Sequence, residues 1–296
     1  MRLLMYQFDG VPRLGAARGD NVIDLQRLAE TRGEEVPADI LGVIDRGNEG
    51  LAQLRRLLEA NDGTSGRPLS EVEILPPLNP PRGNVIAIGR NYLEHARESA
   101  RATGEAVARP TVFSMAQTSI TGPHSDIPTH ANVTRQIDWE VELGVVLGMQ
   151  GTDIPRERAM EYVFGYTVLN DVSARDVQYN WGGQFFKGKS LDGFCPIGPY
   201  IVTADEIPDP QNLQLCCRVN GETKQDANTR DMIFPIDELI AQLSLGMTLL
   251  PGTLIATGTP EGVGFAREPK EFLHAGDLLE SEVAGIGTLR NRFVGE

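Results

Sequence analysis

Seven consecutive residues near the middle of the chain, 137–143, alternate strictly between apolar and acidic side chains. An alternation of period two is typical of a β-strand whose two faces lie in different surroundings. We expect the apolar members to face a core and the acidic members, Asp138, Glu140 and Glu142, to share the other face. The run continues as the apolar segment 144–148, which favours a strand buried on both faces over a solvated edge strand.

The acidic face of this strand requires a source of positive charge. Side chains on one face of a strand are only about 7 Å apart, so their carboxylates repel one another. Mg²⁺, Mn²⁺ and Ca²⁺ prefer oxygen ligands and would relieve that repulsion. A solvated acidic face is the alternative, but the buried continuation of the strand favours a metal site.

The composition excludes several classes of partner. The net charge of −14 argues against binding to nucleic acid or to an anionic membrane. Three cysteines, two of them adjacent, make no disulfide framework and indicate a reducing compartment. No signal peptide is evident, and no apolar run reaches membrane-spanning length. We therefore expect a cytoplasmic protein without a nucleic-acid or membrane partner.

The 296 residues are expected to form two units. Residues 1–75 read as a small α/β domain with strands at 3–8, 12–16 and 21–25 and helices at 25–32 and 49–61. Residues 76–296 read as the main domain, in which short strands are expected at 85–88, 111–113, 140–147, 165–168, 199–202, 213–219, 253–257 and 278–283. Helices are expected there at 92–100, 156–161 and 236–245. Because strands arrive in runs, we predict a strand-rich α+β fold, a mixed β-roll or sandwich, and not a doubly wound sheet.

A third carboxylate follows another predicted strand. Asp171 comes directly after the apolar segment 165–169 and, with the two glutamates, would complete a three-carboxylate metal site. Alone, Asp171 is equally consistent with a helix N-cap. For Arg175 and Asp176, a structural ion pair and a functional role both remain open.

Three further segments carry groups suited to catalysis. His95 and Glu98 are three residues apart, so they share a helix face, and a carboxylate beside the imidazole suits a general base; a surface salt bridge is the alternative. Lys187 or Lys189 could neutralise a substrate carboxylate or enolate, or be a solvated loop lysine. The glycine-rich segment 257–264 lacks the lysine of a P-loop, but its amides and Thr259 could bind a carboxylate or oxyanion.

Taken in order, these segments resemble the fumarylacetoacetate hydrolase family over about residues 84–294. The matching segments are 89–92 with His95 and Glu98, 140–144, 170–176, 188–190, 232–234 and 257–264. The ordered set is specific, although each piece is a weak motif. Relatives often carry Phe-x-Lys-Pro where this chain has Phe113-Ser114-Met115-Ala116, a departure that bears on the substrate.

The resemblance implies a metal enzyme, usually a homodimer, that acts on a small oxo acid. It places Mg²⁺ or Mn²⁺ on Glu140, Glu142 and Asp171 and a water-activating pair on His95 and Glu98. It places a lysine close to the metal at Lys189. The substrate contacts that it implies fall on Arg90, Tyr92, Gln178 and Thr259.

The resemblance leaves the reaction open. We expect hydrolysis of a C–C bond in a 2,4-dioxo acid such as an acylpyruvate, with His95 activating water and a metal-stabilised enolate departing. The alternatives at the same site are decarboxylation of a 2-oxo acid such as oxaloacetate, keto–enol isomerisation, and cleavage of ureidoglycolate. A catalytically silent relative that binds a dicarboxylate is a further alternative, disfavoured because the whole polar set is present.

Overall fold

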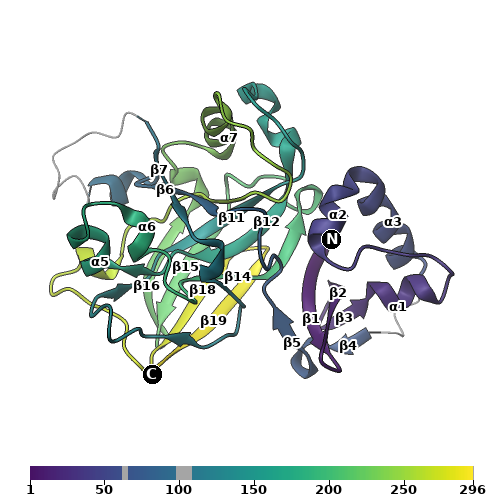
Figure 1. The fold of residues 1–296 in the computed structure, drawn as a ribbon, viewed down its shortest axis with the longest axis horizontal. Helices are drawn as coiled ribbons and strands as arrows, with labels where there is room; N and C mark the ends of the chain where they lie inside the picture. The colour runs from purple at the N-terminus through teal and green to yellow at the C-terminus, as the bar shows by residue number, and fades with distance from the viewer. Residues whose placement is uncertain (62–65, 98–108, 296) are drawn as a thin grey trace.

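The computed structural model describes residues 1–61, 66–97 and 109–295, and they form a strand-rich α+β fold, as predicted. Ten strands run across the largest sheet in the order β4-β3-β2-β1-β14-β12-β11-β17-β6-β7, with β5 and β8 paired to its members. A five-stranded sheet has the order β16-β15-β18-β19-β9, and β10 pairs with β13. In Figure 1 the C-terminal strands of the smaller sheet, in yellow, lie beside β15.

The bounds of the strands follow. They are β1 Arg2–Phe8, β2 Val11–Arg18, β3 Asn21–Asp24, β4 Gly66–Pro68, β5 Glu73–Leu75, β6 Val85–Gly89, β7 Thr111–Met115, β8 Ile120–Thr121, β9 Ile127–Pro128, β10 Ile137–Asp138, β11 Val141–Leu147, β12 Val163–Asn170, β13 Ser173–Ala174, β14 Cys195–Thr203, β15 Gln214–Val219, β16 Glu222–Asn228, β17 Leu254–Ala256, β18 Leu278–Val283 and β19 Gly287–Val294.

The helices are short and lie mostly at the ends of the sheets. They are α1 Leu25–Glu30, α2 Ile40–Asp45, α3 Gly47–Glu59, α5 Arg175–Asn180, α6 Phe185–Gly188 and α7 Ile236–Ser244, and residues 93–97 are also helical. The α-helix expected at 156–161 is instead a 3₁₀ segment, η3 Arg156–Tyr162, which begins after Pro155 without a side-chain cap. In the described part of the chain, no helix is both long and apolar enough to cross a membrane.

Strand β11 lies near the middle of the large sheet. It pairs with β12 on one side and β17 on the other, and all seven of its residues are buried. The expected buried strand is therefore present, but it is not continuous with Ile137. The chain leaves the extended pairing at 139–140, and the two residues before the break form β10, which pairs with β13.

The N-terminal strands extend the same large sheet. Strand β1 pairs antiparallel with β14, with Arg2 opposite Val202. Apolar residues from both regions, among them Leu3, Leu14, Ile197 and Ile201, belong to one buried cluster. Figure 1 shows this unit, in purple, at one end of the long axis. A domain boundary at residue 75 stays a prediction.

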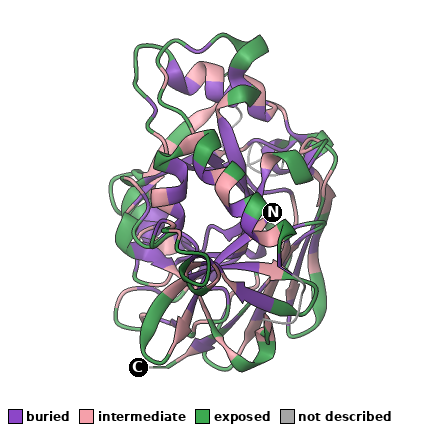
Figure 2. Cartoon of the chain, turned by 90° about the vertical axis from the view of Figure 1, so that its right-hand side faces the viewer, coloured by how far each residue is buried: buried purple, intermediate pink, exposed green. Residues whose placement is uncertain are grey.

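The main core lies between the large and the small sheet. Val145 and Val168 of the large sheet share a buried cluster with Leu215, Leu279 and Leu289 of the small one. Figure 2 shows the buried residues gathered in the central strands and the exposed ones in the outer loops and helices. The buried strands β11 and β12 belong to this arrangement, and the polar residues described next are at their ends.

Candidate active site

The pairing of β11 with β12 brings three carboxylates together. Val141 lies opposite Asn170, and the backbone N–H of Asp171 donates to the carbonyl of Glu140 at 2.9 Å. This register puts Glu140, Glu142 and Asp171 on one side of the paired strands. Ligand oxygens of the three lie within 4.8 Å of one another. The three residues are at most 6% exposed, so the predicted carboxylate cluster is buried.

Lys189 is inserted among these carboxylates. Its ammonium donates to Glu140 Oε2 at 2.8 Å and to Asp171 Oδ2 at 2.9 Å, and the residue is 1% exposed. The preceding Gly188 packs so closely that a Cβ there would lie 2.7 Å from the backbone nitrogen of Gln178. Helix α6 can therefore deliver Lys189 to the carboxylates only because residue 188 has no side chain.

Arg175 binds the other carboxylate oxygen of Glu140. Its Nη2 donates to Glu140 Oε1 at 2.6 Å and its Nε to Asp138 Oδ2 at 2.8 Å. Its Nη1 donates to the side-chain oxygen of Gln178 at 3.0 Å. Asp138 is fully buried and lies in an ion pair, so it is not a member of the three-carboxylate cluster. Arg175 thus links the cluster to a fourth buried carboxylate.

The protonation of the three carboxylates differs because their neighbours differ. Burial opposes ionisation of Glu140, but Lys189 and Arg175 hold its pKa at about 2. Burial raises the pKa of Asp171 to about 7 against the opposing effect of Lys189, with Glu140 adding to the rise. Burial and then the charges of Asp171 and Glu140 raise the pKa of Glu142 well above its usual range. The Lys189 and Arg175 side chains therefore favour the charged form of Glu140, while Glu142 and Asp171 are not stabilised in that form to the same extent.

A divalent cation fits this cluster. In the described part of the chain, two buried cations, Lys189 and Arg175, lie among four buried carboxylates, those of the cluster and Asp138. Asp171 Oδ1 is buried and accepts no hydrogen bond from any described residue, so this oxygen could serve as a metal ligand. A hard divalent ion prefers such a set of oxygens.

The glycine-rich segment 257–264 does bind carboxylates through its amides, but they belong to the protein. The Gly258 N–H donates to Glu142 Oε2 at 2.7 Å, and the Gly264 N–H donates to Asp138 at 2.6 Å. Gly258 has φ +101, and a Cβ on it would lie 2.7 Å from Asn91, so another residue would be strained there. The hydroxyl of Thr259 donates to the Val141 carbonyl at 3.0 Å, which anchors the segment to β11.

The remaining predicted site residues differ in their burial and in their contacts. His95 is 9% exposed, lies in the helical residues 93–97 and acts electrostatically on Glu140. Glu98 lies outside the described residues. Tyr92 is fully buried, and its hydroxyl has no hydrogen-bond partner among the described residues. Arg90 has φ 57 and donates to Thr111 Oγ1 at 3.3 Å, and Gln178 is held by Arg175.

Comparison with known proteins identifies the family. Residues 84–294 match the model described as fumarylacetoacetate (FAA) hydrolase C-terminal. The chain belongs to the fumarylacetoacetate hydrolase family. A fumarylacetoacetate hydrolase from the psychrophile Exiguobacterium antarcticum is 37% identical with a TM-score of 0.85, and the alignment covers 100% of both chains.

Two other solved structures represent different reactions. A maleylpyruvate hydrolase from Sphingobium sp. SYK-6, in complex with manganese(II) and pyruvate, is 30% identical with a TM-score of 0.78 over 100% of this chain and 99% of that one. A 5-carboxymethyl-2-hydroxymuconate delta-isomerase from Mycobacterium smegmatis is 32% identical with a TM-score of 0.74 over the same shares. The fumarylacetoacetate hydrolase family thus includes metal-dependent hydrolases and isomerases.

Reasoning from the sequence missed the structural partners of the cluster. The alternation predicts that Asp138 shares a face with Glu140 and Glu142. In the structure, Asp138 instead accepts hydrogen bonds from the Gly264 and Phe265 amides, which are more than a hundred residues away along the chain. Arg175 does form an ion pair, with Asp138 and Glu140. The sequence feature that could have indicated this ion pair is an arginine four residues after Asp171. Such a short motif does not identify the partner of the arginine.

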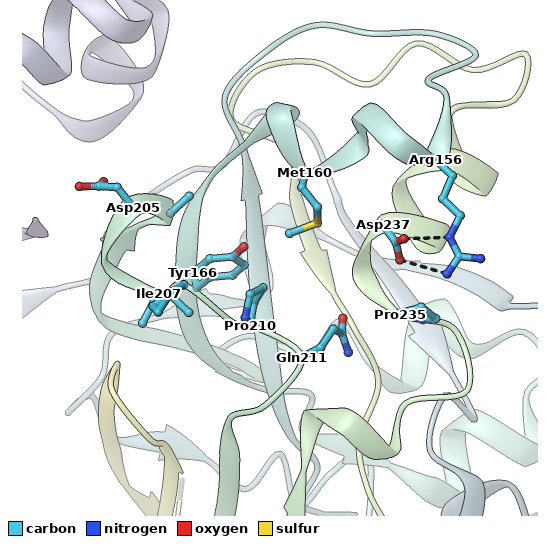
Figure 3. Close-up of a pocket in the computed structure, with 11 residues that line it drawn as sticks. Arg156, Met160, Tyr166, Asp205, Ile207, Pro210, Gln211, Pro235 and Asp237 are labelled. Atoms are coloured by element: carbon cyan, nitrogen blue, oxygen red, sulfur yellow. Dashed lines mark hydrogen bonds and ion pairs between the residues drawn. The ribbon is translucent and has the colours of Figure 1, made fainter.

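Another hollow of the fold lies apart from this cluster. A cavity of about 590 Å³ lies between η3, the segment 204–211 and the start of α7 (Figure 3). Its Arg156 is paired with Asp237, and both are partly exposed. None of the predicted site residues lines it.

We expect Asp138→Asn to destabilise the fold by about 3–5 kcal/mol, since it removes one of the two carboxylates that pair with the buried Arg175. The asparagine side chain would also place its NH₂ group, a donor, beside backbone N–H groups of Gly264 and Phe265 that donate to the carboxylate of Asp138. Urea unfolding would measure the change. The matched control is Asp237→Asn in the exposed pair of Figure 3, which should cost less than about 1 kcal/mol. Equal costs for the two variants would contradict this account of Asp138.

Proposed function

We propose that this enzyme hydrolyses a C–C bond in a 2,4-dioxo acid of the acylpyruvate type. The observation that carries the proposal is the buried set of three carboxylates with Lys189 bridging two of them. The similarity to a maleylpyruvate hydrolase solved with manganese(II) and pyruvate supports it. The overall reaction adds water: the acyl fragment leaves as a carboxylic acid and the remainder as pyruvate.

Glu140, Glu142 and Asp171 would hold the metal, either Mg²⁺ or Mn²⁺. When bound, the ion acts as a Lewis acid on the 2-oxo group and offsets the negative charge of the substrate. The buried cluster holds its ligands in place before substrate arrives, because each has a partner: Lys189 for Glu140 and Asp171, and the Gly258 amide for Glu142. Pre-organised ligands need no rearrangement during the reaction.

The remaining residues would bind the substrate and move protons. The imidazole of His95 would take a proton from the water that attacks the distal carbonyl carbon. The C–C bond then breaks, and the pyruvate fragment carries the electron pair until C3 is protonated. The Lys189 ammonium would stabilise that negative charge. Gln178 has its oxygen held by Arg175, which leaves its NH₂ group to donate to a substrate carboxylate.

Isomerisation is the second candidate, because one relative of similar fold is a 5-carboxymethyl-2-hydroxymuconate delta-isomerase. The same binding residues would serve it, with His95 carrying a proton between two carbons instead of activating water. Three further expectations stay predictions: assembly as a homodimer, a cytoplasmic location, and contacts of Arg90, Tyr92 and Thr259 with the substrate.

The reaction is tested by supplying a panel of substrates with Mg²⁺ or Mn²⁺ and following products by NMR. The panel contains acylpyruvates, an unsaturated 2-hydroxy dioate, oxaloacetate and ureidoglycolate. We expect acylpyruvates to yield pyruvate and a free carboxylic acid. Conversion of the dioate without bond cleavage, in the absence of acylpyruvate hydrolysis, would establish the isomerase instead. Turnover of oxaloacetate or ureidoglycolate alone would refute both.

A further inference from the structure

A second polar cavity lies in the N-terminal unit, lined by residues of β1, β2, β3, β4 and α1, with a volume of about 820 Å³. Its basic residues are Arg13, Arg27, Arg32 and Arg67. Among the described residues that line it, only Asp24 and Glu30 are acidic. The chain as a whole has 41 acidic and 27 basic residues. The cavity therefore carries an excess of positive charge within an acidic protein, and none of its residues belongs to the metal cluster.

Arg13 is only partly neutralised. It lies opposite Tyr6 in the pairing of β1 with β2, and its Nη1 reaches Asp24 Oδ2 at the long distance of 3.3 Å. The same oxygen accepts the Tyr6 hydroxyl at 2.8 Å, and the other Asp24 oxygen accepts the Arg27 amide. Arg13 Nε is buried and has no hydrogen-bond partner among the residues that the structure describes. A buried guanidinium N–H without an acceptor is costly unless a ligand supplies one.

Arg67 is held in place without being neutralised. Its guanidinium carbon lies 3.9 Å from the centroid of the Phe8 ring, and that of Arg13 lies 5.9 Å from the same ring. Stacking on an aromatic ring fixes the plane of a guanidinium and leaves its N–H edge free to donate. In the described part of the chain, no hydrogen bond or ion pair of the Arg67 side chain is formed. Two like charges thus gather around one aromatic ring.

We propose that this cavity binds a small organic anion, with a carboxylate or phosphate group on Arg13 and Arg67. Guanidinium groups bind both kinds of oxyanion through paired N–H donors. The apolar part of the ligand would lie against Phe8 and the neighbouring Leu28, which also line the cavity. The proposal is independent of the reaction at the metal cluster, because the two sites share no residue.

The test is calorimetric titration of the full-length protein with phenyl phosphate, phenylacetate and inorganic phosphate. Each titration is run with Mn²⁺ and again with a chelator, because an anion bound at the metal centre would respond to the chelator and one in the cavity would not. We expect saturable binding that the chelator leaves unchanged. Comparing the first two probes tells phosphate from carboxylate recognition, and inorganic phosphate shows whether the apolar body is needed.

Variants place the anion in the cavity. Arg67→Gln removes a charged donor and should weaken binding about tenfold or more, which corresponds to about 1.4 kcal/mol. Its unfolding temperature should stay close to that of the parent, since Arg67 contributes only a stacking contact. Arg13→Gln should weaken binding similarly. Arg18→Gln is the matched control: it lies in β2 as Arg13 does but does not line the cavity, and it should change the affinity by less than about twofold.

Three outcomes would overturn the proposal. One is the absence of saturable binding by every probe at concentrations on the order of 10 mM, where even a weak site is filled. Another is loss of binding on chelation of the metal. The third is an equal loss in Arg67→Gln and Arg18→Gln, which would mean that general surface charge attracts the anion.

Discussion

Asp171→Asn is expected to abolish divalent metal binding and to lower turnover by about a thousandfold or more, because a bound ion contributes several kcal/mol to stabilisation of the transition state. The substitution keeps the shape of the side chain and removes one of the three ligand charges. It also replaces one of the two carboxylate oxygens by an NH₂ group, which cannot bind a cation. Titration with Mn²⁺ by calorimetry and an activity assay measure the two effects separately.

The same variant should keep its fold. Lys189 keeps Glu140 as a partner when Asp171 is replaced, and burial already raises the pKa of Asp171 to about 7, so loss of its charge costs little in the metal-free protein. We therefore expect the metal-free variant to unfold at a temperature no lower than the metal-free parent. Added Mn²⁺ should raise the unfolding temperature of the parent, since a ligand that binds only the native state stabilises it, and should leave the variant unchanged.

Asp192→Asn is the matched control for this experiment. Asp192 is exposed, lies three residues after Lys189 and is not a member of the cluster. Its replacement removes one negative charge close to the site in sequence and should leave Mn²⁺ affinity within about twofold of the parent value. Mn²⁺ affinity of Asp171→Asn equal to that of Asp192→Asn would refute the assignment of the metal ligands.

The sequence was sufficient to predict the strand that carries the cluster and the carboxylates that meet there. The alternation at 137–143 and the apolar run after it indicate β11, and Asp171 directly follows the next strand of the sheet, β12. Antiparallel neighbours of this kind bring the start of one strand beside the end of the other. Local periodicity therefore contained most of the geometry of the three-carboxylate cluster.

Contacts between distant segments were beyond such reasoning. The break at 139–140 turns Asp138 toward Arg175 and the Gly264 amide, and nothing in a two-residue period marks it. The pairing of β1 with β14 joins segments about two hundred residues apart. The glycine-rich segment does bind carboxylates, but two of its amides donate to carboxylates of the protein itself, which its local sequence does not indicate. A local pattern shows which groups need a hydrogen-bond or ion-pair partner, while the fold determines which residues become those partners.

His95→Asn is expected to separate hydrolysis from the other reactions open to this site. An amide cannot accept a proton near neutral pH, so the attacking water would lose its general base. Hydrolysis of an acylpyruvate should then fall by about 10²–10⁴-fold, the usual contribution of general-base catalysis. Decarboxylation of oxaloacetate needs no attacking water and should be nearly unchanged. Initial rates for both substrates with Mn²⁺ provide the comparison.

The metal and the fold are monitored so that the loss can be traced to the proton transfer. His95 is not one of the three clustered carboxylates, so Mn²⁺ affinity should remain close to that of the parent. His274→Asn is the control for removal of a histidine, because His274 is exposed and far from the cluster in sequence, and both rates should be unchanged. A general base is needed only where water is activated or a proton is moved between carbons. If His95→Asn left acylpyruvate hydrolysis intact, the proton would have to be taken by another group, and the assignment of His95 as the general base would be refuted.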